Sequence, residues 1–203
     1  MTMRPRVRKV ALTAHVTSSV GWLGAVVAYL ALAIAGLTSH ETQQASAAYL
    51  AMWVVASSVI VPFSLAALLT GLIQSLGTEW GLFRHYWIAA KFVLTVAATT
   101  VLLLHVGTVN RMADIAAGMS SGAADASGLR IQLVVHAAGG LLVLLAATVL
   151  SIYKPWGKTP YGKRADAAGN TSTPWQTYVV AGAIGLVLLV LVLHVLGGGP
   201  RGH

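Results

Sequence analysis

Two histidines within long apolar runs are the residues of this chain best suited to chemistry. His105 lies near the end of one run, and His136 lies near the start of the next. Ionisable side chains are costly inside a membrane, so they mark functional sites there. Imidazole nitrogens ligate haem iron and also suit copper. The pair therefore predicts a cofactor or metal site between two neighbouring membrane helices.

Apolar runs make up most of the chain and must position these histidines. Of the 203 residues, 57% are hydrophobic and 9% are charged, with a mean hydropathy of +0.77. The runs are continuous and long enough to cross a bilayer as helices, which need about 20 residues. The sequence predicts an all-α fold, a polytopic membrane protein whose single domain (residues 1–203) is a bundle of five transmembrane helices. Their expected bounds are residues 10–37, 47–76, 87–109, 131–152 and 175–196.

The distribution of basic residues predicts the orientation of the bundle. Cytoplasmic segments of membrane proteins are enriched in Lys and Arg. With the N-terminus inside, ten basic residues are cytoplasmic and three are outside. We therefore expect a cytoplasmic N-terminus and an outer C-terminus in a bacterial inner membrane. The cytoplasmic set is Arg4, Arg6, Arg8, Lys9, Arg84, Lys91, Lys154, Lys158, Lys163 and Arg164, and the outer set is Arg111, Arg130 and Arg201.

The predicted depth in the membrane divides the histidines of the apolar runs into two groups. His105 and His136 each lie six residues inward of an outer arginine, which is roughly 9 Å at the rise of an α-helix. They can therefore face each other. His15 lies roughly 9 Å from the opposite surface on the same arithmetic, so it cannot reach them.

Small and basic residues beside the pair favour haem b. Gly139 and Gly140 share a helix face with His136, so a flat group could approach the backbone closely there. His105 and His136 would be the two axial ligands, near the outer face. Arg111 and Arg130 at the mouth of the site could pair with the propionates, since guanidinium suits carboxylates. Such a protein would serve electron transfer or redox sensing, as a component of a membrane oxidoreductase.

Several alternatives stay open. A copper-binding or copper-transport protein would add His40, His194 and two methionines, Met112 and Met119, to the pair. His15 could hold a second metal or, together with His85, a second haem on the inner side, or it could occupy a quinone or proton-uptake position. The histidines could also only bond neighbouring helices, and the small-residue faces could bind other chains. The protein would then be a non-catalytic accessory subunit of a larger complex or a homo-oligomer.

Composition excludes several other classes. There is no cysteine, so disulfides, thiolate metal sites and covalent c-type haem are excluded. All five carboxylates fall between the apolar runs, which argues against a carboxylate-based ion carrier. No phosphate-binding loop motif is present. The net charge of +8 belongs to segments flanking the runs, so it indicates contact with the lipid bilayer rather than nucleic acid.

Three local features carry further expectations. Pro62 interrupts the second run and predicts a bend, with the serine hydroxyls at positions 57, 58 and 64 available to the freed carbonyl. Lys91 lies near the end of its run, from which it can extend to the headgroups. Residues 110–129 are rich in Gly, Ser and Ala and predict a loop.

Two segments resemble known membrane proteins. The segment HVTSSVGWLG, residues 15–24, resembles small polytopic bacterial proteins of the copper-resistance D type. Residues 78–106, with WGLFRHYW, KFVLTV and LLLHV, are similar to an actinobacterial family of uncharacterised membrane proteins, and the wider comparison is to b-type cytochrome bundles. The first resemblance implies metal transfer, and the last implies haem-mediated electron transfer.

Overall fold

Four long helices dominate the part of the chain that the computed structural model describes, which is residues 3–77, 82–118, 126–153, 157–160 and 162–163. All four are long and apolar enough to cross a membrane. The fifth predicted span, residues 175–196, lies outside the described residues and includes His194. The elements are α1 Pro5–Thr38, α2 Thr42–Val55, a π-helical turn Ala56–Ile60, α3 Val61–Gly77, α4 Tyr86–Ala116 and α5 Ala126–Tyr153; α2, the π turn and α3 together form the second of the four helices.

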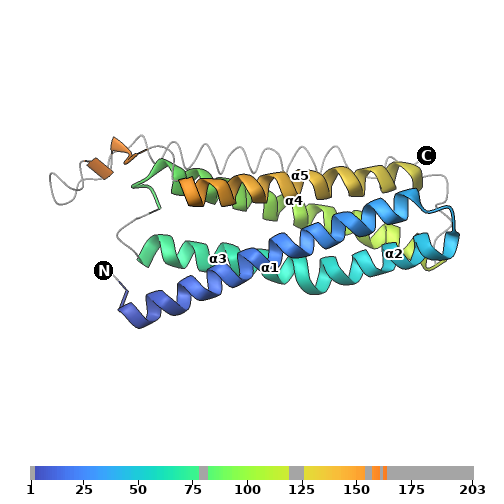
Figure 1. Cartoon of the computed structure of the whole chain (residues 1–203), viewed down its shortest axis with the longest axis horizontal. Helices are drawn as coiled ribbons and strands as arrows, with labels where there is room; N and C mark the ends of the chain where they lie inside the picture. The colour runs from blue at the N-terminus through green and yellow to red at the C-terminus, as the bar shows by residue number, and fades with distance from the viewer. Residues whose placement is uncertain (1–2, 78–81, 119–125, 154–156, 161, 164–203) are drawn as a thin grey trace.

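The helices lie side by side along one long axis (Figure 1). Helix α1 crosses the bundle and contacts α2, α3 and α5, while α4 contacts α2, α3 and α5. We call the end with the start of α1 the basic end; α3 and α5 finish there and α4 begins there. We call the opposite end, with the connections after α1 and α4, the loop end. The described basic residues at the basic end are Arg4, Arg6, Arg8, Lys9, Arg84, Lys91, Lys158 and Lys163; those at the loop end are Arg111 and Arg130.

Large apolar side chains cover the outside of the bundle. Val10, Val20, Leu69, Leu142 and Ile152 are each more than half exposed. Many exposed apolar side chains are unfavourable in water but suit the hydrocarbon core of a bilayer. The exposed valines and leucines therefore agree with the membrane-spanning character of the helices.

The helices extend beyond the apolar runs that predicted them. The predicted loop at residues 110–129 was too long, because α4 continues to Ala116 and α5 already begins at Ala126. Gly118, with φ of 73°, follows the end of α4 in the left-handed conformation that glycine favours after a helix. Met112, expected in the loop, is instead buried on α4 with 2% exposure.

A π-helical turn precedes the proline of the second span. The backbone N–H of Val61 bonds back to the carbonyl of Ala56, the pattern of a turn with one additional residue. Ser57 Oγ donates to the carbonyl of Trp53 at 2.8 Å. The helical turn before Pro62 is thus widened, which lets the helix continue through the proline. Ser57 bonds to Trp53 rather than to the carbonyl that the proline frees, and the expected bend stays a prediction.

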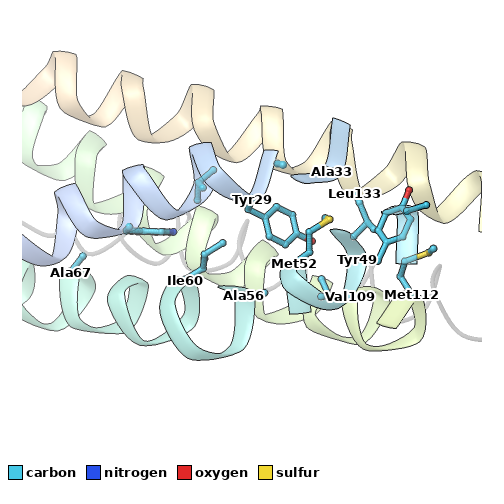
Figure 2. Close-up of a cluster of buried hydrophobic side chains, with 14 residues drawn as sticks. Tyr29, Ala33, Tyr49, Met52, Ala56, Ile60, Ala67, Val109, Met112 and Leu133 are labelled. Atoms are coloured by element: carbon cyan, nitrogen blue, oxygen red, sulfur yellow. The ribbon is translucent and has the colours of Figure 1, made fainter. Parts of the chain in front are cut away.

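Close packing against glycine joins α1 to the second span. Figure 2 shows Tyr29, Tyr49, Met52 and Leu133 among the buried side chains between the helices. Tyr49, Met52 and Leu133 are each at most 2% exposed. Gly36 lies against the Tyr49 ring so closely that a Cβ there would be 2.7 Å from Cζ. Absence of a side chain at this position sets the spacing of α1 and α2.

A short segment closes the basic end. The backbone N–H of Thr159 donates to the carbonyl of Arg84 at 2.9 Å, and its hydroxyl donates to the carbonyl of Phe83 at 2.7 Å. Gly162 approaches this connection closely, because a Cβ there would be 2.5 Å from the Arg84 carbonyl oxygen. The chain after α5 is therefore fastened to the connection before α4.

Candidate functional site

The two predicted imidazoles are in contact. His105 on α4 and His136 on α5 stack with ring centroids 4.1 Å apart and planes 9° apart. His105 is 5% exposed, and His136 is partly buried. The helix pair α4 and α5 runs antiparallel, so the two residues reach the same depth although they are 31 positions apart in sequence.

A hydrogen bond fixes the protonation pattern of His136. Its Nδ1 lies 2.9 Å from the carbonyl oxygen of Gln132, one helical turn earlier. A carbonyl oxygen only accepts, so Nδ1 carries the hydrogen. In the neutral ring Nε2 then has its lone pair available. Histidines that ligate metals usually have this arrangement, with the second nitrogen donating to a carbonyl or carboxylate.

A cavity of about 310 Å³ lies beside the pair. Both histidines line it, as do Gly139 and Gly140, and the remaining lining is almost entirely apolar. A Cβ at either glycine would meet no atom within 4 Å among the described residues. These glycines therefore do not serve close packing between the described helices, as Gly36 does. They leave open space next to the imidazoles.

The imidazole nitrogens of His105 and His136 are suitable ligands for haem iron, but the stacked rings are not oriented to hold it. Two axial imidazoles point their nitrogens at the iron from opposite faces of a porphyrin. Rings stacked at 4.1 Å leave no room for a macrocycle between them. Binding between His105 and His136 requires the rings to turn and separate, whereas binding at His136 Nε2 alone leaves His105 in place.

The two arginines expected at the mouth differ in their surroundings. The guanidinium carbon of Arg130 lies 5.6 Å from the centroid of the Tyr49 ring, within the range of a cation–π contact. Arg111 is exposed on α4. Arg130 is thus held against the core, while Arg111 is accessible at the loop end.

The set of ligands expected for copper is not gathered in the described chain. His40 is exposed in the connection between α1 and α2. Within the described ranges no group of three or more His, Cys, Asp or Glu residues could hold a metal ion. His194 and Met119 lie outside those ranges.

A second polar cluster lies toward the basic end, where His15 joins three helices. His15 Nδ1 lies 3.1 Å from both the carbonyl oxygen of Ala67 and Thr70 Oγ1. Thr70 donates its own hydrogen to the carbonyl of Ala66 at 2.6 Å. His15 Nδ1 therefore donates, and Nε2 is the acceptor. Lys91 Nζ lies 3.5 Å from that Nε2 and can only donate to it.

Both nitrogens of His15 thus have partners within the protein, unlike those of a metal ligand awaiting its ion. The sequence correctly separated His15 from His105 and His136, but it did not predict Lys91 as the partner of His15, because that side chain was expected to extend to the headgroups. The available signal was the set of polar residues within otherwise apolar runs. Thr70, Gln74 and Lys91 all belong to it, and Gln74 Nε2 donates to the carbonyl of Ala11 at 2.8 Å.

Comparison of the chain with protein-family models, with characterised proteins and with solved structures found no match.

Proposed function

We propose that this chain is an integral protein of the bacterial inner membrane that binds haem b at His105 and His136 and serves electron transfer or redox sensing. The observation that carries the proposal is the contact between two intramembrane imidazoles beside a cavity. Two further features support it: His136 Nδ1 is used by the Gln132 carbonyl, which leaves the Nε2 lone pair for a ligand, and open space lies at Gly139 and Gly140. The stacked rings would have to separate before both could hold one haem.

Each residue of the site would have a distinct role in holding such a group. His136 would supply Nε2, oriented by the Gln132 carbonyl. His105 would supply the second imidazole, for which its ring must leave the stack. The apolar lining would exclude water and so tune the potential of a bound iron. Haem b would supply one-electron chemistry at this depth.

The basic residues support an orientation with the basic end in the cytoplasm. Eight of the ten described Lys and Arg residues outside or near the ends of the spans belong to that end, and two belong to the loop end. The histidine pair is then closer to the outer face, where a redox partner or quinone would exchange electrons with it.

An absorption spectrum of the detergent-purified protein from haem-replete cells tests the proposal. We expect a Soret band that His136→Ala abolishes and His105→Ala shifts or abolishes. His40→Ala is the matched control, because His40 is exposed and outside the cavity lining. Gly140→Leu should also lower haem content while both imidazoles remain, because its side chain would enter the open space.

A colourless preparation would refute the proposal. Elemental analysis of the same sample then separates the alternatives. Copper bound in a manner that depends on His105 would favour copper handling, whereas absence of metal together with co-purifying chains would favour an accessory subunit.

A further inference from the structure

A second cavity opens between the helices toward the basic end, and its chemistry differs from that of the first. Its volume is about 520 Å³, and residues of α1, α3, α4 and α5 line it. The polar lining includes Arg8, His15, Gln74 and Lys91. We propose that this cavity binds the phosphate of an anionic phospholipid, with Lys91 and Arg8 as the cationic ligands.

Charge at the cavity favours an anion. Arg8 and Lys91 bring two cations to one lining, and none of the described lining residues is a carboxylate. The described carboxylates, Glu41 and Asp114, belong to the loop end. Two cations at one cavity repel each other, and an anion bound in the cavity would offset that repulsion. Lys and Arg are the residues that proteins use to bind phosphate.

The ammonium of Lys91 is positioned rather than free to extend. His15 Nε2 accepts one of its hydrogens, and His15 is itself held by the carbonyl of Ala67 and by Thr70. Gly71 lets the imidazole approach, because a Cβ there would be 3.0 Å from His15 Cε1. An ammonium has three hydrogens, so two remain for another acceptor.

Depth and lining match a lipid. Lys91 lies five residues into α4 and is therefore roughly 8 Å from the start of the helix, near the boundary between headgroups and hydrocarbon. The lining also contains Leu12, Val16 and Phe92, which suit an acyl chain. Basic pockets between membrane helices on the cytoplasmic side are known to hold anionic headgroups.

The test is binding of defined lipids to the full-length protein in detergent, measured by native mass spectrometry. Phosphatidylglycerol should bind at least about fivefold more tightly than phosphatidylcholine with the same acyl chains, and Lys91→Gln should lower its affinity about fivefold. Lys91→Arg, which keeps the charge, should retain most of the affinity. Arg111→Gln is the control, because it removes one charge at the loop end. Thermal denaturation identifies any variant that is misfolded, and Arg8→Gln then provides the second test of the same cavity.

Several results would overturn the proposal. Equal binding of the two lipids by the parent protein would do so, as would equal losses in Lys91→Gln and Arg111→Gln. Glu79 belongs to residues 78–81, outside the described part of the chain. Binding by Glu79→Gln but not by the parent would show that Glu79 is the counter-charge of the ammonium and would also overturn the proposal.

Inorganic phosphate added as a competitor identifies the source of the anion. Displacement of phosphatidylglycerol would assign the site to the phosphate group alone, and persistence of the lipid would assign it to the whole phospholipid. Both results support an anion site, and neither depends on whether His105 and His136 bind haem.

Discussion

Substitution of Gly36 by alanine tests how the first helix packs on the second span. A Cβ at Gly36 would lie 2.7 Å from Cζ, 2.9 Å from Cε1 and 3.0 Å from the hydroxyl oxygen of Tyr49. Tyr49 is only 2% exposed, and Arg130 covers its ring. The ring therefore cannot move aside without disturbing its neighbours, so either the tyrosine or α1 must shift.

The matched control is Gly24→Ala on the same helix, where a Cβ would meet no described atom within 4 Å. Alanine is favoured over glycine in a helix by about 1 kcal/mol at both positions, so this gain cancels in the comparison. Overpacking at Gly36 costs about 1–3 kcal/mol. The two variants should therefore differ by about 1–3 kcal/mol in stability, which is roughly 2–12 °C in Tm for a chain of this size.

Thermal denaturation of both variants in one detergent measures the difference. Removal of the ring in Gly36→Ala/Tyr49→Ala should restore the gain expected of alanine, so that the cost of Gly36→Ala depends on Tyr49. Equal Tm values for Gly36→Ala and Gly24→Ala, or a cost at Gly36 that persists without the Tyr49 ring, would refute the packing described for α1 and α2.

Two further predictions concern the connections. Gly162→Ala should release the segment after α5 from Arg84, because the new Cβ would clash with a backbone carbonyl oxygen, which cannot move aside as a flexible side chain can. Hydrogen exchange at residues 82–85 should therefore rise. Gly157→Ala, with open space at its Cβ, should leave that exchange unchanged. Trp53→Phe should lower the unfolding free energy by about 0.5–1.5 kcal/mol through loss of the 3.1 Å bond from Nε1 to Asn110 Oδ1. Asn110→Ala should then add little in the double variant, and full additivity in denaturation experiments would contradict a direct bond.

The membrane helices followed from sequence because lipid imposes one strong requirement, a long apolar run with satisfied backbone groups. Their ends did not follow, since a helix can continue into water beyond the run. Met112 illustrates this: its neighbours Asn110 and Arg111 are polar, yet helix α4 continues and buries the methionine. Hydropathy identifies the part of a helix inside the bilayer rather than the whole helix.

The sequence predicted only part of the candidate site. Depth along antiparallel helices brought His105 and His136 to one level, and the structure brings their rings into contact. Rotation about each helix axis and the choice of rotamer decide whether such rings stack, point apart or face a ligand, and spacing does not determine either. For the same reason the bond between Lys91 and His15, which lie 76 positions apart, could not be predicted.

The π-helical turn at Ala56–Ile60 holds one more residue than a regular turn without changing the phase between the two halves of the second span. One residue corresponds to about 100° of rotation in a regular α-helix. Deletion of a residue from the regular part of α2 would therefore rotate all of α3, and Gly71 would no longer lie against His15. Deletion of a residue from the π turn would instead leave a regular turn and keep that contact. The turn is therefore a place where the second span can lose a residue while the cavity at the basic end stays aligned with the packing at the loop end.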